Sequence, residues 1–227
     1  MVYVLCGLVF GLFIPYIARR FAKFMPATFG YALYRIFTPG KSLNRERRKN
    51  PRYKNLRSAF LRRSLLWGIV TAGLTFAAVR FFAAGTAGWA VYFIWTLLLL
   101  TEIDDRMELL PDILTVPLLI IGFNFAVMNG GWAGIGDSSV GALGGYFIPA
   151  LASLTLVWKN KDVFGGGDIK LLAGIGAWLG LENLLYVIIL SCGLFLVYAL
   201  LNRRRQGAFG PAIAAAAIIV AFFMFGY

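Results

Sequence analysis

Acidic residues in two segments far apart in the sequence are the side chains best suited to chemistry. Between two apolar stretches lie five of them, Glu102, Asp104, Asp105, Glu108 and Asp112. Another, Asp168, follows three consecutive glycines, Gly165, Gly166 and Gly167, and opens a further apolar stretch. Two carboxylates in a partly desolvated site share one proton, so one can activate water while the protonated one polarises a peptide carbonyl. The pattern predicts acid–base hydrolysis by two aspartates.

Asp104 and Asp168 are the strongest candidates for that pair. Asp104 directly follows an apolar stretch. A carboxylate at the C-terminal end of a helix interacts unfavourably with the helix dipole, which indicates that a reason other than helix stability, such as a function, places it there. Asp168 is expected as a helix N-cap, with Lys170 placed to keep it ionised. The three glycines permit positive φ angles and the close approach of another chain. Asp112 has a simpler interpretation as the N-cap of the next helix.

Each aspartate also has an ordinary structural explanation. Asp104 could be a solvated helix end, and Asp168 could cap a glycine turn. The chain has no histidine, and its two cysteines, Cys6 and Cys192, lie inside apolar stretches. The sequence therefore predicts no metal site and no disulfide, and the absence of histidine disfavours most other hydrolase mechanisms.

The elements that position these acids are predicted to be membrane helices. The chain has 227 residues, of which 60% are hydrophobic and 14% charged, a composition typical of a polytopic membrane protein. We expect an all-α bundle with about eight transmembrane segments, at 2–18, 65–82, 89–103, 113–127, 140–158, 171–181, 184–201 and 212–225. The segment 171–181 is shorter than the roughly 20 residues that span a bilayer, so it is expected to be a short or re-entrant helix.

The distribution of basic residues predicts the topology. Of the 22 Lys and Arg residues, 21 lie in the segments 19–63, 104–112, 159–170 and 202–211. By the positive-inside rule all four segments face the cytoplasm, which places both acidic regions on that face. We therefore divide the chain into a first transmembrane anchor (1–18), a basic cytoplasmic loop (19–63) and a membrane-embedded core (64–227).

The basic loop is expected to attract the anionic headgroups of the lipid bilayer, at about 1 kcal/mol for each basic residue near the surface. Its first part, 21–37, mixes apolar and basic residues and could form interfacial helices. The part 42–57 is expected to be solvated and poorly ordered. Nucleic acid is not an expected partner, because few aromatic residues alternate with the charges. Tryptophans near the ends of the apolar stretches are expected to be interfacial anchors.

Two motifs resemble those of the type IV prepilin peptidases, a family of GxGD-type intramembrane aspartyl proteases. They are Ile103-Asp104 followed by Leu110-Pro-Asp-Ile-Leu-Thr-Val-Pro, and Gly165-Gly-Gly-Asp-Ile-Lys-Leu-Leu. The similarity covers about residues 99–181, with a weaker match at Ala208-Phe-Gly-Pro. The resemblance implies an aspartic endopeptidase that cleaves the basic leader from type IV prepilin or pseudopilin helices. Cleavage would occur at the cytoplasmic face of the bacterial inner membrane, with Asp104 and Asp168 as the catalytic pair.

The resemblance also implies features beyond proteolysis. Many members methylate the new N-terminus with S-adenosylmethionine, whereas proteolysis itself uses no cofactor. Arg106 stands where many members carry another acid, so Asp105 is the alternative to Asp104 as the first catalytic residue. Interpretations from other classes are a small proton-coupled transporter and a scaffold protein of a secretion machine. The presenilin-like branch lacks support, because no Pro-Ala-Leu segment lies near the C-terminus.

Overall fold

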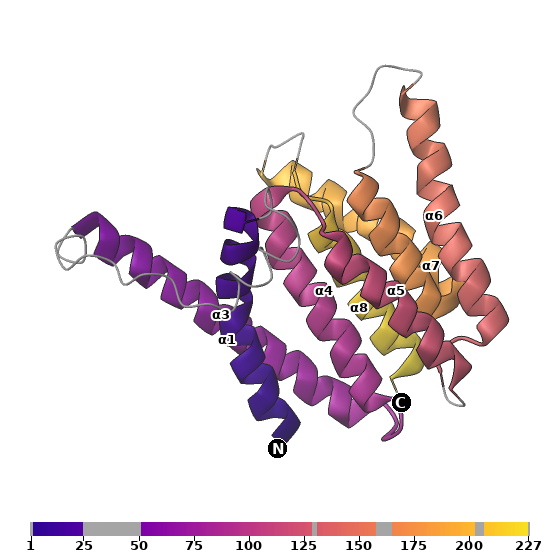
Figure 1. The fold of residues 1–227 in the computed structure, drawn as a ribbon, viewed down its shortest axis with the longest axis horizontal. Helices are drawn as coiled ribbons and strands as arrows, with labels where there is room; N and C mark the ends of the chain where they lie inside the picture. The colour runs from indigo at the N-terminus through magenta and orange to yellow at the C-terminus, as the bar shows by residue number, and fades with distance from the viewer. Residues whose placement is uncertain (1, 25–50, 129–130, 158–164, 203–206, 227) are drawn as a thin grey trace. The chain divides into compact units, whose positions relative to one another are not determined.

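The computed structural model describes residues 2–24, 51–128, 131–157, 165–202 and 207–226, which are helical with short connections and contain no strand. The predicted all-α class is confirmed. The helices shown in Figure 1 are α1 (Val2–Phe24), α3 (Pro51–Phe81), α4 (Ala87–Met107), α5 (Asp112–Val127), α6 (Ile135–Val157), α7 (Gly166–Asn202) and α8 (Gly210–Phe225).

The chain divides into two compact units, Met1–Ala77 and Ala78–Tyr227. In the first unit, α1 and α3 approach closely through small residues. A Cβ atom added to Gly11 would lie 2.8 Å from the Cα atom of Gly68, and one added to Gly7 would lie 2.6 Å from the hydroxyl oxygen of Thr75. Small residues at helix crossings let two backbones approach within lipid.

Helices extend into both ends of the expected basic loop. α1 continues to Phe24, and α3 begins at Pro51, so part of the segment expected to be poorly ordered is helical. Most of the expected interfacial segment lies outside the described residues. The division of the chain at residues 18 and 63 stays a prediction.

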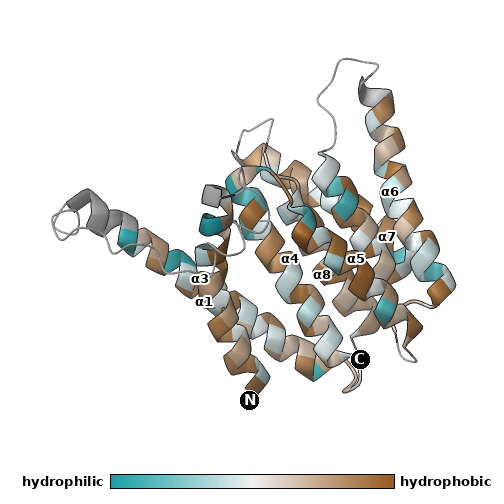
Figure 2. Ribbon diagram, viewed as in Figure 1, coloured by the Kyte–Doolittle hydropathy of each residue, from teal (hydrophilic) through white to brown (hydrophobic). Residues whose placement is uncertain are grey.

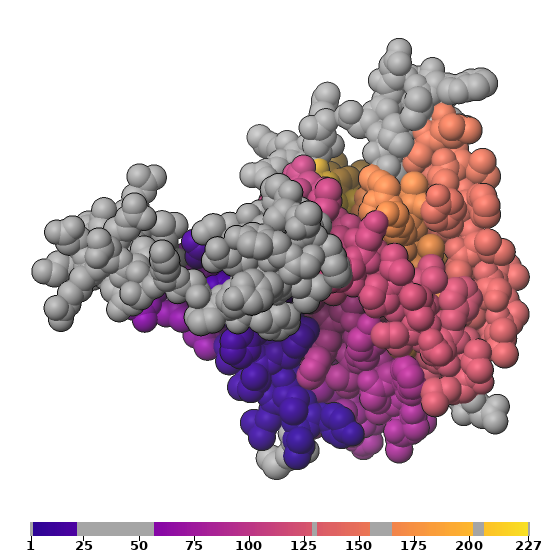
Figure 3. Space-filling view, viewed as in Figure 1, coloured from indigo at the N-terminus to yellow at the C-terminus, as the bar shows by residue number. Residues whose placement is uncertain are grey.

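The second unit is a bundle of α4 to α8. Within it α7 packs against α5, α6 and α8, while α4 packs against α8 and α5. Figure 3 shows α4, α5 and α6 along one face of this unit. Local sequence explains the helix ends that face the site. Pro211 occupies the first turn of α8, where its missing N–H costs no hydrogen bond. Glu108 ends α4 in the left-handed conformation, at φ 51° and ψ 36°.

Gly180 reverses the direction of α7. Its φ of 78° and ψ of 173° interrupt the helix, a conformation open mainly to glycine. In a straight helix, Asp168 and Tyr198 would lie about 45 Å apart. Instead, Tyr198 shares a cavity with Pro211 in the first turn of α8, and Asp168 interacts with Asp104, which contacts the same turn. The expected apolar stretches 171–181 and 184–201 therefore lie in two helical limbs that meet at Gly180.

Four helical stretches in the described part of the chain are long and apolar enough to cross a membrane. By length and composition they are Val2–Phe21, Arg57–Phe81, Ala87–Met107 and Gly166–Leu201, the last of which is interrupted at Gly180. α5 and α8 are shorter apolar helices of 16 residues each. The expected eight apolar stretches coincide with helices except for the last residues of the stretches 65–82 and 140–158, but eight membrane crossings are not confirmed. Figure 2 shows hydrophobic residues along the helices, with hydrophilic residues mostly toward their ends.

An aromatic cluster forms the core at the Gly180 end of the bundle. Trp178 is fully buried, and its ring centroid lies 5.0 Å from that of Phe93, 5.1 Å from that of Phe125 and 5.9 Å from that of Trp132. Its indole N–H donates a 2.8 Å hydrogen bond to the carbonyl oxygen of Leu118. The expectation of an interfacial tryptophan is therefore wrong at position 178, because the ring is enclosed by protein.

Candidate active site

Asp104 lies in the last turn of α4, where the first residue of α8 holds its carboxylate. Its side chain is buried, and Oδ2 accepts a 2.9 Å hydrogen bond from the backbone N–H of Gly210. A Cβ atom added at Gly210 would lie 2.6 Å from the same oxygen, so any side chain at this position would displace the carboxylate. The N–H groups in the first turn of a helix lack partners within the helix, and here one of them positions the carboxylate.

Asp168 lies in the first turn of α7, which begins at Gly166. The predicted N-cap position is therefore wrong by three residues, because Gly165 immediately precedes the helix. The backbone N–H of Asp168 donates to the carbonyl oxygen of Gly165 at 3.0 Å, and its half-buried carboxylate accepts a hydrogen bond from the backbone of Gly165. This side chain reaches back over the helix start as the acid of a capping box does.

The structure brings Asp104 and Asp168 together. They are close enough for the charge of Asp104 to act on the carboxyl group of Asp168. Gly167 permits this arrangement, because a Cβ atom added there would lie 2.9 Å from the Cβ atom of Leu110 and 3.2 Å from its nitrogen. The first turn of α7 therefore packs directly on the connection between α4 and α5.

The other two glycines of the turn are less restricted: a Cβ atom added at Gly165 would lie 3.3 Å from Asp168 Oδ2, a close contact with a side chain. Gly165 and Gly166 are exposed, and a Cβ atom added at Gly166 would meet nothing within 4 Å. Their expected role in admitting the substrate backbone stays a prediction. The tightest packing restriction of the three therefore falls on Gly167.

Lys170 contacts Asp112. Its ammonium donates to both carboxylate oxygens of Asp112 at 2.7 Å, and both side chains are largely exposed. This ion pair does not support the expectation that Lys170 keeps Asp168 ionised. Asp112 is the first residue of α5, with Pro111 at the cap position and no capping hydrogen bond from a side chain, so its predicted N-cap role is wrong.

Asp105 and Arg106 lie on other sides of α4. Asp105 is exposed and lines a cavity with residues of α7 and α8. Arg106 forms an ion pair at 2.7 Å with Glu102, whose side chain is fully buried. Of the two neighbouring aspartates, Asp104 accepts the Gly210 hydrogen bond, whereas Asp105 lies on the side of α4 that faces the cavity. Within the described ranges, no three His, Cys, Asp or Glu side chains gather as metal ligands.

Sequence reasoning missed the role of Gly210. The signal was present, since a Gly-Pro pair at the start of an apolar stretch marks the first turn of a helix and its free N–H groups. Nothing in the sequence showed that such an N–H group points at Asp104, which precedes Gly210 by 106 residues.

Fold and site together define a multi-pass membrane protein with paired carboxyl groups at one end of its helix bundle. The chain belongs to the type IV leader peptidase family, whose model matches residues 91–200. It is 35% identical over 158 residues to the prepilin leader peptidase/N-methyltransferase of Escherichia coli (strain K12), a match covering 66% of this chain and 69% of the relative. Both candidate catalytic aspartates fall within the matched region.

Two further relatives carry the same name. The one from Aeromonas hydrophila is 39% identical over 159 residues, covering 65% of this chain and 54% of the relative. The one from Neisseria gonorrhoeae is 38% identical over 130 residues, covering 55% of this chain and 44% of the relative. The chain thus spans about half the length of these two relatives. No solved structure matches it.

Proposed function

We propose that the chain is an aspartic endopeptidase that removes the leader from type IV prepilin or pseudopilin precursors. The observation that carries this proposal is the meeting of Asp104 and Asp168, 64 residues apart in sequence, with the Asp104 carboxylate held by Gly210. Membership in the leader peptidase family supports the substrate class. The relatives are named prepilin leader peptidases, and we infer the same activity for this chain.

The two carboxyl groups can perform the hydrolysis with one shared proton. Asp104 Oδ2 is held by the N–H of Gly210, which leaves Oδ1 to take a proton from the attacking water. The water oxygen bonds to the scissile carbonyl carbon while protonated Asp168 gives its proton to the carbonyl oxygen. Asp104 then passes its proton to the leaving nitrogen, the C–N bond breaks, and Asp168 recovers a proton from the hydroxyl group.

The substrate must reach the carboxyl pair as an extended segment. A peptide bond inside a helix is shielded by its own hydrogen bonds, so the precursor helix unwinds locally before cleavage. Gly165 and Gly166 are exposed beside Asp168 and offer backbone without side chains for this approach. The precursor helix is thus the proposed partner, together with anionic lipid headgroups on the basic segments.

We place the protein in the bacterial inner membrane with the site facing the cytoplasm. The described helix ends that adjoin three of the four basic segments in the sequence, 104–112, 159–170 and 202–211, lie at the end of the bundle where Asp104 and Asp168 lie. The positive-inside rule supports this orientation.

Methyl transfer would require a site for S-adenosylmethionine, and the relatives' names include N-methyltransferase. The cavity beside Asp105 does not fit this group. At about 240 Å³ it is smaller than the roughly 300–1,000 Å³ of pockets for drug-sized ligands. Its lining also offers a carboxylate where the carboxylate of the methionine portion would need a cation.

The transporter alternative is not favoured by the position of the acids. Asp104 lies in the last turn of α4 and Asp168 in the first turn of α7, whereas coupling sites of transporters lie near the bilayer midplane.

The test is cleavage of a synthetic prepilin-precursor peptide by purified variants, followed by mass spectrometry. We expect Asp104→Asn and Asp168→Asn each to lower kcat/KM by about 10²–10⁴-fold, because each removes one acid–base group. Asp137→Asn is the matched control, an exposed aspartate in the first turn of α6. It should cleave as the wild type does. Normal cleavage by either dyad variant would refute the assignment, and no cleavage by the wild type would refute the function.

A further inference from the structure

Two cations, Arg106 and Lys170, lie at the end of the bundle that holds the carboxyl pair, among the described residues of the second unit. Each is bound to an acid outside that pair. Arg106 lies 2.7 Å from the buried carboxylate of Glu102, and the Lys170 ammonium donates to both carboxylate oxygens of Asp112 at 2.7 Å. Acids outnumber cations at this end, so the placement of each cation decides which carboxyl groups receive a positive charge.

The printed donors to the carboxyl pair itself are neutral backbone groups. Asp104 accepts a hydrogen bond from the N–H of Gly210, and Asp168 accepts one from the backbone of Gly165. The charge that acts on the Asp168 carboxyl group is the negative charge of Asp104. Two adjacent carboxyl groups hold one proton in common, whereas a nearby cation favours the state in which both are ionised. The shared proton therefore depends on keeping cations away from the pair.

Lys170 lies near enough to Asp168 to affect that proton. It follows Asp168 by two residues in α7, which is an advance of about 3 Å along the helix axis. Its ammonium is carried by a flexible stem of four carbons. A carboxyl pair that shares one proton has a net negative charge, and charges within a Debye length of about 8 Å attract each other. A Lys170 side chain without another partner would therefore be drawn toward the pair.

Asp112 is well placed to hold this cation. It opens α5 directly after Pro111, and the preceding residue, Leu110, is buried against Gly167 at the start of α7. The body of α5 also packs against α7. The free N–H groups in the first turn of a helix favour a negative charge at this position. The Asp112 carboxylate is thus a fixed anion beside the start of α7, and it binds the Lys170 ammonium through both oxygens.

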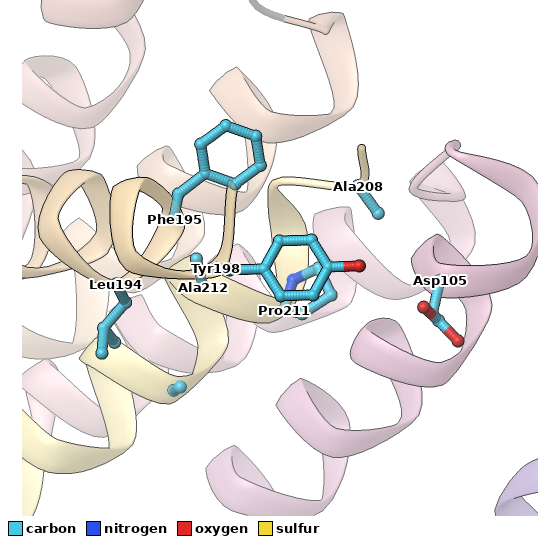
Figure 4. A pocket seen from close by; sticks show the side chains of 8 residues that line it. Asp105, Leu194, Phe195, Tyr198, Ala208, Pro211 and Ala212 are labelled. Carbon is cyan, nitrogen blue, oxygen red and sulfur yellow. The ribbon is translucent and has the colours of Figure 1, made fainter. Parts of the chain in front are cut away.

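The other charged groups near the carboxyl pair are acids. On α4, the charges of Glu108 and Asp105 act on the Asp104 carboxyl group. Asp105 lines the cavity between α4, α7 and α8, and Figure 4 shows the Tyr198 hydroxyl directed to the side on which Asp105 lies. α8 has no charged residue, and the charged residue of α6, Asp137, lies beside Gly180 at the opposite end of the bundle. The charged residues of the adjoining segments outside the described ones are Lys159, Lys161, Asp162, Arg203, Arg204 and Arg205.

We propose that Asp112 is a positioning residue that holds the Lys170 ammonium away from Asp168, so that the carboxyl pair keeps its shared proton. The proposal rests on the proposed peptidase function and gives the ion pair a part in it. It accounts for a lysine that stands two residues from a catalytic acid and yet binds a different carboxylate. The Arg106 cation is already held on its own helix by the fully buried Glu102, so Lys170 is the cation whose partner matters.

The test is the pH dependence of kcat/KM for cleavage of a precursor peptide by full-length variants. The alkaline limb of a bell-shaped profile reports the pH at which the carboxyl pair loses its shared proton. In Asp112→Asn the released ammonium favours the ionised pair, so the proton leaves at a lower pH. We expect the alkaline limb to move down by about one pH unit. Asp112→Glu keeps a carboxylate for Lys170 and should retain the wild-type limb.

A double variant separates the released cation from the loss of the Asp112 charge itself. Asp112→Asn combined with Lys170→Gln has neither charge, so its alkaline limb should return to the wild-type pH. Lys170→Gln alone should not move the limb to lower pH, because it releases no cation. The position of the limb does not depend on how much enzyme is folded, so a loss of stability does not imitate the effect.

The outcomes distinguish this inference from the proposed function. An unchanged alkaline limb in Asp112→Asn would overturn the role of Asp112. The same downward shift in the double variant would also overturn it, because the missing Asp112 charge would then account for the shift. A rise of about one pH unit in Lys170→Gln would overturn it too, since the ammonium would already act on Asp168 in the wild type. Failure of the wild type to cleave the peptide at any pH would instead refute the peptidase function.

Discussion

At the scale of single residues, the site depends on one backbone N–H group and one carboxylate. Asp104 is buried, and Gly210 donates to its Oδ2 at 2.9 Å. This bond fixes one oxygen of the carboxylate and leaves the other for chemistry. The lack of a side chain at position 210 is what allows the backbone to approach so closely.

Replacement of Gly210 tests this contact. In Gly210→Ala, the new Cβ atom would lie 2.6 Å from Asp104 Oδ2, so the carboxylate must move. We expect kcat/KM for the precursor peptide to fall by about 10²-fold, since a displacement of about 1 Å in a catalytic group has an effect of that order. Gly207→Ala serves as the control, because its Cβ atom would have an ordinary 3.7 Å contact with Tyr198 Cε1. Wild-type kcat/KM in Gly210→Ala would contradict the proposed role.

At the scale of elements, α7 brings distant parts of the chain to one end of the bundle. Its first limb packs tightly on α6, where a Cβ atom added at Gly145 would lie 2.8 Å from the Cα atom of Ala173. Gly180 then turns the chain back, and the second limb contributes Tyr198 to the cavity beside α8. Gly145 thus permits the close packing of α6 on α7, whereas Gly180 permits the reversal of the chain through its positive φ.

The packing of the first turn of α7 gives a matched pair of variants. Gly167→Ala places a Cβ atom 2.9 Å from the Cβ atom of Leu110, and such overpacking costs about 1–3 kcal/mol. We expect its melting temperature in detergent to fall by several degrees. Gly166→Ala adds an atom with nothing within 4 Å and should melt as the wild type does.

Activity of the same pair addresses a separate question. If Gly166→Ala melts normally but cleaves the precursor more slowly, the exposed glycine admits the substrate backbone as proposed. Equal melting temperatures for the two variants would contradict the packing role of Gly167.

At the scale of the whole molecule, the helix bundle of the second unit has two chemically different ends. The acids of 102–112 and Asp168 lie at one end, and the aromatic cluster around Trp178 lies toward the other. α5 joins the two ends over 16 residues, about 24 Å. The proposed orientation therefore makes a simple prediction about access from each side of the membrane.

Single cysteines introduced before α5 and at the start of α6 report this orientation. In a chain with Cys6→Ala and Cys192→Ala, Leu109→Cys and Gly136→Cys each present an exposed thiol. An impermeant maleimide should label position 109 only in inside-out vesicles and position 136 only in intact spheroplasts, because the basic segments hold the site on the cytoplasmic side. Labelling of both from the same side would contradict the topology.

The sequence by itself determined the helical membrane class, the two acidic regions and the family. Hydrophobic stretches and the distribution of Lys and Arg are local properties, and a carboxylate beside glycines can be recognised without coordinates. The positions of the helix starts were less well predicted, as Asp112 and Asp168 show, because both lie inside the first turn instead of capping it.

Only the tertiary structure decided which groups meet. The bond from Gly210 to Asp104, the Lys170–Asp112 pair and the cavity beside Asp105 each join segments separated by more than 50 residues. The enclosure of Trp178 is of the same kind. Such contacts depend on where a broken helix turns back and on which glycines let helices approach, and hydrophobic patterning specifies neither. The physical reason is that patterning records which face of a helix is apolar, whereas the partner of a polar atom is selected by packing in three dimensions.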